Sequence, residues 1–336
     1  MTLRQAARLA RLTRASLQAA LLRSGLEAGL FAALAEPKGA HELADTLGLA
    51  PDLCEAFLRA AHASGFVEKV GERYRRGAFT AWLLSSADGD AAVALLDQAV
   101  LSYAPIVGRL PELLRGGPRP SFGGGEEAER VARASRLLER RALAALDRVP
   151  GTRRARRILD VGCGEGSMLA ALLAHYRDAL GLGVEREPSL AELARRRLEA
   201  AQVHRRGEVW VGDVLREELP AGEWDLALLN QVLHYFDDAQ RDLLFARIAK
   251  RLAADGVLAI QTSVVQEGAF ARISGTAAST ALFDLFLRSH ANLSGLPDPT
   301  DLQVRLRAAG FTRLGSVSIV PGGSLRYVWA TRSGAL

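Results

Sequence analysis

The sequence predicts an α/β fold whose larger, second part is a mostly parallel sheet covered by helices, preceded by a smaller, mainly helical domain. Three observations support this prediction. Short apolar runs alternate with helical patterns from residue 156 onward, and glycines follow the first of these runs. Residues 1–115 show helical periodicity with a single hairpin signal. At 336 residues, the chain is long enough for two domains.

The composition is that of an ordinary globular protein, with 49% apolar and 24% charged residues. Arginines on solvated helix faces explain the net charge of +5 better than an acidic partner does. Cys54 and Cys163 are far apart, which favours neither a disulfide framework nor a zinc site and fits a reducing compartment. We identify no stretch apolar enough to predict a transmembrane helix. We therefore expect a cytoplasmic protein with no membrane and no nucleic-acid partner.

The first domain, residues 1–115, is predicted to consist of helices and one hairpin. Helical patterns cover residues 1–35, 41–49, 50–66 and 89–115. Gly29 lies near a break in the first pattern, and Pro105 and Pro111 interrupt the last one. The segments FVEKV and ERYRR flank Gly71 and predict a hairpin. The order of helices and hairpin resembles that of a winged helix.

Residues 116–150 are predicted to connect the two domains. The segment GGPRPSFGGG at 116–125 is the clearest breaker-rich stretch of the chain. Residues 126–149 follow as a long amphipathic helix with glutamate in its first turn, where the helix dipole favours acids. The pair Pro150-Gly151 ends this helix, and the second domain is predicted to cover residues 151–336.

Seven apolar runs in the second domain predict seven strands. They lie at residues 157–161, 179–185, 207–213, 224–230, 256–264, 312–320 and 325–331. Helical patterns separate most of them, and their near-continuous apolar character predicts a parallel sheet covered on both faces. Only a short break containing PGG separates the last two runs, so we expect them to form an antiparallel hairpin at the edge of the sheet.

Polar residues stand where the first four of these strands end, which is where open α/β sheets bind ligands. The first strand runs into Asp160 and a turn with three alternating glycines, which let a nucleotide-like ligand approach the backbone. Glu185 ends the second strand, about 20 positions after the first glycine, where a carboxylate can hold a ribose. The ligand is therefore predicted to contain a ribose. Both dinucleotides and S-adenosylmethionine meet this requirement.

Two features favour S-adenosylmethionine over a dinucleotide. The dinucleotide pattern needs Gly or Ala at its sixth position, where this chain has Ser167. Asp160 and Glu165 place carboxylates on both sides of the turn, where they would repel a pyrophosphate and attract a cation. S-adenosylmethionine has no phosphate and carries two positive charges, a sulfonium and an α-ammonium.

The stretch LDVGCGEGS resembles motif I of the class I S-adenosylmethionine-dependent methyltransferases, and four motifs in the same order extend the resemblance over about 150–336. The resemblance implies a Rossmann-like domain in which the glycine turn holds the methionine part, with Asp160 near its ammonium. It also implies that Glu185 meets the ribose and Asp213 the adenine amine. The implied cofactor-binding residues are Asp160, Gly162, Cys163, Gly164, Gly166, Glu185, Arg186, Gly212, Asp213, Val214, Asn230 and Gln231.

Residues 1–115 resemble the winged-helix dimerisation module of the small-molecule O-methyltransferases, in the segments GLFAALAEPKGAHELADTLGL and FLRAAHASGFVEKVGERYRR. The resemblance implies a homodimer formed through this domain, which also helps to close the substrate pocket. A DNA-reading winged helix is disfavoured. Its second helix carries Asp52 and Glu55 beside a single Arg59, so phosphate repulsion would oppose its insertion into a groove.

His234 is the candidate catalytic residue. It follows the fourth strand in WDLALLNQVLHYFDD, the segment that matches the loop over the methyl site. A histidine there can take the proton of a hydroxyl acceptor, as the matching histidine does in the plant-type enzymes, and the alternative is a structural role in the loop. The family's glutamate partner for this histidine is missing from ANLSGLPDPTDLQ. Asp298 and Asp301 in that stretch, and Glu267 before it, are alternatives.

The acceptor pocket is expected to draw on aromatic and apolar side chains. The candidates are Tyr103, Phe122, Tyr235, Phe236, Phe270, Phe283, Phe286, Leu287 and His290. Such a lining fits an apolar or aromatic secondary-metabolite intermediate, although the same residues can equally form the domain core or the dimer interface. We expect no metal, because the sequence shows no cluster of metal-binding residues.

The predicted activity is methyl transfer from S-adenosylmethionine to a hydroxyl group. Methylation of carbon or nitrogen would use the same frame, because a base is needed only where the acceptor must lose a proton. Two further alternatives are a relative that binds S-adenosylmethionine without transferring methyl and a DNA-binding regulator that senses it. Cys163 is expected to pack within the turn, since no base stands beside it.

Overall fold

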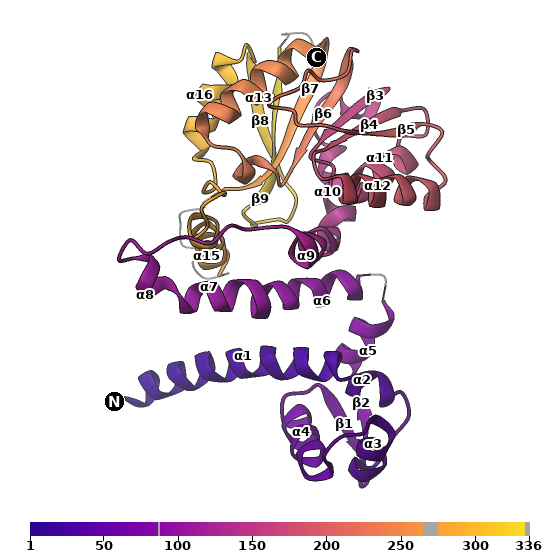
Figure 1. The fold of residues 1–336 in the computed structure, drawn as a ribbon, viewed down its shortest axis with the longest axis vertical. Helices are drawn as coiled ribbons and strands as arrows, with labels where there is room; N and C mark the ends of the chain where they lie inside the picture. Colours follow the sequence, from indigo (N-terminus) through magenta and orange to yellow (C-terminus); the bar gives the residue numbers. More distant parts are fainter. Residues whose placement is uncertain (87, 265–274, 333–336) are drawn as a thin grey trace. The chain divides into compact units, whose positions relative to one another are not determined.

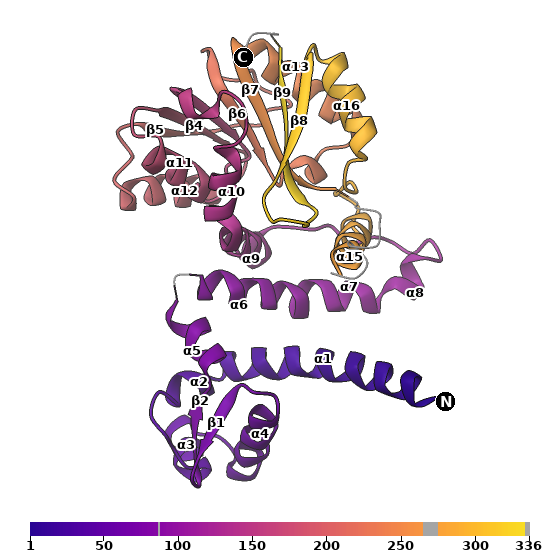
Figure 2. The ribbon, with the colours of Figure 1, turned by 180° about the vertical axis from the view of Figure 1, so that it is seen from behind.

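The computed structural model describes residues 1–86, 88–264 and 275–332, and the chain divides into two compact units (Figure 1, Figure 2). Met1–Gly108 and Gly124–Leu137 form the first, called here the N-terminal unit. Arg109–Gly123 and Leu138–Leu336 form the second, called the sheet unit. The breaker-rich segment thus belongs mostly with the sheet, whereas the residues that follow it return to the N-terminal helices.

The N-terminal unit is helical except for one hairpin. Its elements are α1 (Leu3–Glu27), α2 (Leu30–Ala33), α3 (Ala40–Leu47), α4 (Pro51–Ala63), β1 (Val67–Val70), β2 (Arg73–Arg76), α5 (Ala78–Ser85), α6 (Gly89–Asp97), η1 (Gln98–Tyr103), α7 (Ala104–Gly108), α9 (Gly125–Ser135) and η2 (Arg136–Leu138). Gly29 adopts a φ of +70° between α1 and α2, a left-handed conformation that glycine accepts without strain. Helices α3 and α4 with the antiparallel pair β1–β2 give the order expected of a winged helix. Phe31, Leu34, Leu43 and Leu58, all 0% exposed, lie at the centre of the core of this unit.

The helix predicted over 89–115 is interrupted, as its prolines require. Pro105 has no N–H to donate to the preceding turn. Just before it the hydrogen-bond ladder widens into the π-helix η1, where the N–H of Ala104 donates to the carbonyl oxygen of Ala99. The last part of the predicted helix is the short α8 (Leu110–Leu113), which belongs to the sheet unit.

By length and apolar composition alone, the stretch Gly89–Gly108 could cross a membrane, contrary to the expectation from the sequence. Two of its residues are acidic and form ion pairs within the N-terminal unit. Asp90 pairs with two arginines of α9 and η2, and Asp97 pairs with Arg23 of α1 at 3.3 Å. This stretch therefore uses its charged residues to attach to neighbouring helices.

The helix predicted over 126–149 is divided between the two units. Its first half is α9 and η2, which Arg133 and Arg136 tie to Asp90 of α6. Its second half is α10 (Glu139–Leu146), where Leu146 is 0% exposed within the core of the sheet unit. The amphipathic pattern runs through both halves, so it could not reveal that they face different cores.

The sheet unit contains seven strands in the order β5-β4-β3-β6-β7-β9-β8. They are β3 (Arg157–Val161), β4 (Leu180–Glu185), β5 (Gly207–Val211), β6 (Trp224–Asn230), β7 (Leu252–Ser263), β8 (Arg313–Ser318) and β9 (Leu325–Thr331). The first five in sequence are parallel, and β9 runs antiparallel to both β7 and β8. The prediction of a mostly parallel sheet with an antiparallel edge hairpin is confirmed.

Helices cover both faces of this sheet (Figure 1). Besides α8 and α10, the unit contains η3 (Thr152–Arg154), α11 (Ser167–His175), α12 (Pro188–Ala200), η4 (Leu233–Tyr235), α13 (Asp238–Arg251), α15 (Thr276–Arg288) and α16 (Pro299–Ala308). Along β3, Ile158 joins the core under α10, α11 and α12, and the next residue, Leu159, joins the core under α13 and α16. This alternation explains why the strands read as continuous apolar runs, because both faces are buried.

Candidate functional site

The order of the strands brings the predicted cofactor residues to one edge of the sheet. Strands β5, β4, β3 and β6 are parallel neighbours, so their carboxyl ends lie in a row. Asp213 follows β5, Glu185 ends β4, Asp160 lies near the end of β3, and Asn230 ends β6. Residues far apart in the sequence are thus collected at the position where α/β sheets bind ligands.

The turn after β3 depends on its three glycines for different reasons. Gly162, Gly164 and Gly166 have φ values of +72°, +55° and +73°, all left-handed. A Cβ on Gly166 would come within 2.8 Å of the Cβ of Ala194, so glycine here lets α12 approach the turn. A Cβ on Gly164 would meet no atom within 4 Å, so this part of the turn is open.

Glu185 is hydrogen-bonded to this turn in the protein without ligand. Its Oε2 accepts from the N–H of Gly164 at 2.9 Å, and its Oε1 accepts from the N–H of Glu187 at 2.9 Å. Glu165, by contrast, forms an ion pair with Arg197 of α12 at 3.0 Å. The sequence argument counted Glu165 among the charges that attract a cation. Because Arg197 balances the charge of Glu165, the attraction of a cation depends on Asp160 and Glu185.

Asp160 is the most deeply buried carboxylate of this group, with 1% of its surface exposed. Its Oδ1 accepts a hydrogen bond from Nδ2 of Asn230 at 3.1 Å. Its Oδ2 has no hydrogen-bond partner among the described residues. Burial raises the pKa of Asp160 to about 7; the hydrogen bond from Asn230 opposes this shift, and the charge of Glu185 adds to it.

The segment after β5 is compact. The Oδ1 of Asp213 accepts from the N–H of Leu215 at 2.9 Å, and the side chain remains 21% exposed. Gly212 lies against the indole of Trp210, where a Cβ would come within 2.4 Å of the ring. Val214 is buried in the core. Of the other residues implied by the resemblance, Arg186 is exposed on the turn after β4 and Cys163 is buried in the glycine turn.

The loop after β6 begins with a strained residue. Gln231 has a φ of +55°, which is uncommon for a residue other than glycine. Its N–H donates to the carbonyl oxygen of Gln261 on β7 at 3.0 Å, and this bond holds the unusual conformation. Such strain is frequent at functional sites, where the surrounding structure compensates for it. The sequence gave no signal for this conformation.

His234 lies on the short helix η4 that follows, and 9% of its surface is exposed. Its ring is 4.5 Å from the ring of Tyr235 and 6.0 Å from the ring of Phe283, measured between centroids. Burial lowers the pKa of His234 to about 4, and the charge of Arg241 contributes. The imidazole is therefore neutral at physiological pH.

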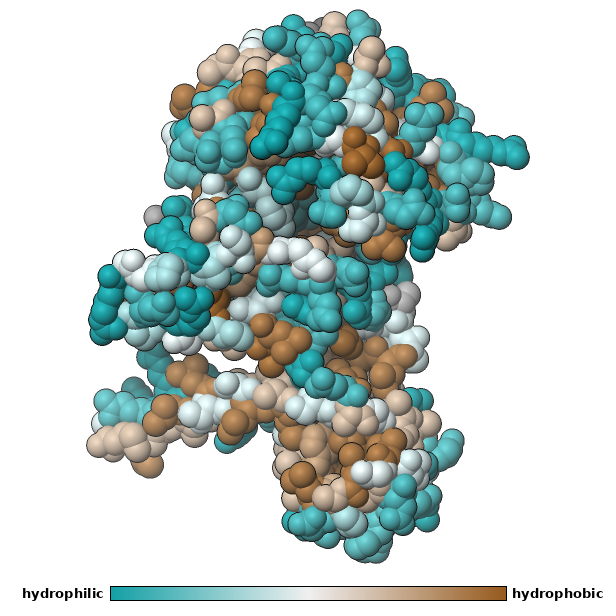
Figure 3. Space-filling model, in the orientation of Figure 1, coloured by the Kyte–Doolittle hydropathy of each residue, from teal (hydrophilic) through white to brown (hydrophobic). Residues whose placement is uncertain are grey.

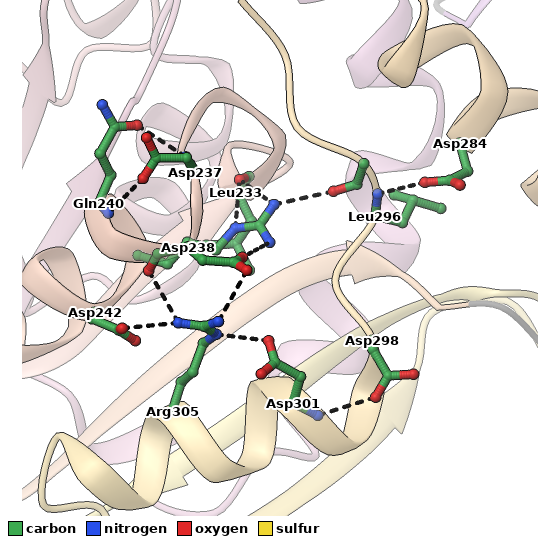
Figure 4. A network of polar contacts seen from close by, with 12 residues as sticks. Leu233, Asp237, Asp238, Gln240, Asp242, Asp284, Leu296, Asp298, Asp301 and Arg305 are labelled. Carbon is green, nitrogen blue, oxygen red and sulfur yellow. Dashed lines mark hydrogen bonds and ion pairs between the residues drawn. The ribbon is translucent and has the colours of Figure 1, made fainter.

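Arg241 of α13 fixes the helix that carries His234, and the sequence reasoning missed it. Its guanidinium, 4% exposed, donates to the carbonyl oxygen of Leu233 from Nε at 3.1 Å and from Nη2 at 3.0 Å. Nη2 also reaches the carbonyl oxygen of Gly295 at 3.0 Å, and Nη1 reaches Asp238 at 3.2 Å (Figure 4). One buried side chain thus connects the start of η4 with the segment after α15.

The carboxylates considered as partners of His234 are engaged elsewhere. Asp298 caps α16 by accepting from the N–H groups of Thr300 and Asp301, and Figure 4 shows the bond to Asp301. Asp301, in the first turn of the same helix, pairs with Arg305 at 2.6 Å. Glu267 lies outside the described residues. Within the described part of the chain, no carboxylate forms a hydrogen bond with the imidazole of His234.

The aromatic residues expected in the acceptor pocket divide into two groups. Tyr235 and Phe283 lie beside His234. Phe286 and His290 of the α15 region pack with Phe122, with ring centroids 4.6 to 5.4 Å apart. Asn292 holds the backbone of Phe122 by accepting from its N–H at 2.7 Å and donating to its carbonyl at 2.8 Å. The other four candidates, whose positions differ, are Phe236 and Leu287 in the sheet unit, Tyr103 in the N-terminal unit and Phe270 outside the described residues.

Comparison with known proteins adds family information. A family model described as a methyltransferase domain matches residues 158–256. A 3-hydroxy-5-methyl-1-naphthoate 3-O-methyltransferase of Streptomyces sahachiroi is 30% identical over 260 residues, which cover 73% of this chain and 74% of that protein. An N,N-dimethyltransferase of Streptomyces rimosus is 31% identical over 274 residues, which cover 76% of this chain and 78% of that protein.

A solved structure shares the whole architecture. An O-methyltransferase family protein from Burkholderia thailandensis matches with a TM-score of 0.80, over 98% of this chain and 99% of that one, at 23% identity. At 23% identity, this match shows a similar fold and nothing further. The match covers both the seven-stranded sheet and the helical region before it.

Proposed function

Because the chain belongs to the S-adenosylmethionine-dependent methyltransferases, we propose that it methylates a hydroxyl group on a small aromatic or apolar acceptor. The observation that carries this proposal is His234, a buried and neutral imidazole next to Tyr235 and Phe283, one turn beyond the end of β6. A relative that is 30% identical carries the name of an O-methyltransferase of a hydroxynaphthoate, and this supports a hydroxyl acceptor.

The residues at the strand ends fit S-adenosylmethionine, which supplies a methyl group on a sulfonium when bound. Asp160 has an oxygen without a partner among the described residues, and the open side of Gly164 leaves room beside the backbone. We assign the α-ammonium to Asp160, the ribose hydroxyls to Glu185 and the adenine amine to Asp213. The further residues assigned to the same site are Gly162, Cys163, Gly164, Gly166, Arg186, Gly212, Val214, Asn230 and Gln231.

In this proposal, the protein positions the acceptor and removes its proton. Tyr235 of η4, Phe283 and Phe286 of α15, and His290 just after α15 provide a largely apolar lining that orients an aromatic ring and excludes water. The free nitrogen of His234 takes the hydroxyl proton as the oxygen becomes a nucleophile. Arg241 keeps η4 in place by binding the carbonyl oxygen of Leu233.

The test is methyl transfer from labelled S-adenosylmethionine to a panel of phenols. We expect His234→Ala to lower turnover by about 10²-fold or more, which is the usual contribution of a general base. His175→Ala is the matched control, because His175 belongs to the same unit, pairs with Asp147 at 3.0 Å and should leave turnover unchanged. Full activity of His234→Ala on every phenol would contradict a base at this position.

Nitrogen is the second candidate acceptor atom, because the 31% identical relative from Streptomyces rimosus is named an N,N-dimethyltransferase. A neutral amine already has a free electron pair, so its methylation would be less sensitive to loss of His234. Adding aromatic amines and keto acids to the panel distinguishes nitrogen and carbon acceptors from hydroxyls. Turnover without transfer of the label would indicate a relative that does not methylate.

The N-terminal unit also supports a homodimer. Helix α1 carries four leucines that are strongly exposed in the single chain: Leu3, Leu9, Leu12 and Leu17 at 90%, 56%, 62% and 71%. The space-filling view shows hydrophobic residues at intervals along α1 (Figure 3). Several exposed large apolar side chains on one helix are typical of a protein contact. We propose that a second copy of the chain covers α1, and that the enzyme acts in the cytoplasm, where Cys54 and Cys163 remain thiols.

A further inference from the structure

We propose that Tyr327 of β9 is a positioning residue for the amino-acid part of S-adenosylmethionine, and that it acts through Asn230 on Asp160. This inference rests on the proposed assignment of the α-ammonium to Asp160. Tyr327 was not among the residues that the sequence or the family resemblance indicated. It lies two strands beyond β6, on the antiparallel strand β9.

The three residues form a chain of hydrogen bonds in which Asp160 and Tyr327 are buried and Asn230 is half-buried. Tyr327 is 0% exposed, and its hydroxyl donates to Oδ1 of Asn230 at 3.2 Å. Nδ2 of the same amide donates to Oδ1 of Asp160 at 3.1 Å. The tyrosine hydroxyl also lies 3.4 Å from the side-chain amide of Gln261 on β7. The chain therefore crosses four strands and ends at the carboxylate.

When Asp160 is ionised, the hydrogens of this chain have one consistent arrangement. A tyrosine hydroxyl has one proton, so it cannot donate fully to both Asn230 and Gln261. If the amide of Gln261 is turned so that its nitrogen faces the hydroxyl, then Gln261 donates to Tyr327, Tyr327 to Asn230, and Asn230 to Asp160. Oxygen and nitrogen of an amide are assigned from such networks. Bonds that all point the same way also strengthen one another.

The tyrosine hydroxyl determines which way the amide of Asn230 faces. With the hydroxyl present, the amide oxygen has a donor and the amide nitrogen is directed to Asp160. Without it, the amide oxygen loses its donor, which costs free energy in a buried site. The amide is then free to rotate and to face Asp160 with its oxygen, which would repel the carboxylate. Tyr327 thus protects the donor that stabilises the charge on Asp160.

The charge on Asp160 depends on this donor, because its other neighbours do not help. Burial, together with the charge of Glu185 on β4, raises its pKa to about 7. The neighbouring groups Cys163 and Tyr327 are neutral, because burial raises the pKa of each. Asn230 is the neighbour that lowers the pKa. The unpartnered Oδ2 of the ionised carboxylate is then available to an ammonium group.

The experiment compares two ligands by calorimetry at pH 8. S-adenosylhomocysteine carries the α-ammonium, whereas 5′-methylthioadenosine lacks the amino-acid part. We expect Tyr327→Phe to weaken the binding of S-adenosylhomocysteine by about tenfold or more, the scale of one hydrogen bond to a charged group. Binding of 5′-methylthioadenosine should change less than twofold. Tyr176→Phe is the matched control, because this hydroxyl of the same unit donates to Asp147 at 2.7 Å.

A double-mutant cycle keeps the test independent of general damage to the fold. In an Asp160→Asn background, Tyr327→Phe should cause no further loss of affinity for S-adenosylhomocysteine. Equal weakening of both ligands, additive losses in the cycle, or unchanged binding would each overturn the inference. If the wild-type protein bound neither ligand, the proposed site itself would fail, which is a different result.

Discussion

The carboxylate of Asp160 is held in the protein at a free-energy cost that depends on pH. Its ordinary pKa is 3.8, and burial raises the pKa to about 7 in the folded protein. Since the folded state binds this proton more tightly than the unfolded state, the group contributes stability below pH 3.8 that is lost as the pH rises to about 7. Above pH 7 the buried charge destabilises the fold by its full amount.

We therefore expect Asp160→Asn to stabilise the protein while damaging the site. The gain in melting temperature should be near zero at pH 4, grow as the pH rises and level off above about pH 7, corresponding to at most a few kcal/mol. Thermal melts between pH 4 and pH 8 measure this gain, with Asp255→Asn, at an exposed position near the start of β7, as the control. At pH 8 the same variant should bind S-adenosylhomocysteine more weakly. A gain in melting temperature that does not change with pH would show that Asp160 titrates normally.

Individual residues differ in how well the sequence reveals them. Asp160 and Glu185 stand at fixed spacings from the glycines, so a local pattern identifies them. Arg241, Gln261 and Tyr327 are connected to the site through contacts with other strands and loops, which no local pattern records. The pairing of Glu165 with Arg197 depends on where α12 packs, and this explains why its charge was misassigned.

At the scale of elements, η4 is a short helix held from outside. Three of the hydrogen bonds of Arg241 go to backbone carbonyl oxygens, two at Leu233 and one at Gly295. The N–H of Ser294 also donates to the carbonyl oxygen of His234 at 2.7 Å. These bonds join the two segments that flank the imidazole, so the position of His234 depends on α13 as much as on its own turn.

We expect Arg241→Met to separate turnover from cofactor binding. Loss of the guanidinium removes three hydrogen bonds to the carbonyl oxygens of Leu233 and Gly295, so η4 should loosen and kcat should fall by about tenfold or more. The affinity for S-adenosylhomocysteine should stay within twofold, because the strand ends are untouched. Arg251→Met, on the same helix and paired with exposed Glu218, is the matched control. Equal losses of kcat and affinity would indicate a general structural effect.

The strands could be predicted closely and the helices less so. Continuous apolar runs between helical patterns mark buried parallel strands, and six of the seven predicted runs begin within one residue of the observed strands, while β7 begins four residues earlier. The long helices of the first half were harder to predict, because helical periodicity does not specify the core that a helix faces. The division of 126–149 into α9 and α10 follows from the ion pairs of Asp90 and the burial of Leu146, which are tertiary effects.

For the whole molecule, the proposed dimer makes the clearest prediction. Burial of the exposed leucines of α1 in a second copy would remove a large apolar area from water, so charges placed there should prevent association. We expect Leu9→Glu combined with Leu12→Glu to convert a dimer into a monomer, as measured by light scattering after gel filtration. Leu53→Glu, at another leucine of the unit that is 69% exposed, is the control. A wild-type monomer at micromolar concentration would contradict the proposal.

The position of β9 also affects how the chain folds as it is synthesised. β9 lies between β7 and β8, so the ribosome releases β8 before the strand that joins it to the sheet. Until Leu325–Thr331 emerges, β7 keeps an unpaired edge, a surface on which nascent chains can aggregate. Tyr327 arrives on the same strand. A nascent chain therefore closes its sheet and completes the hydrogen bonds behind Asp160 in one event, and a ribosome that stalls earlier leaves both unfinished.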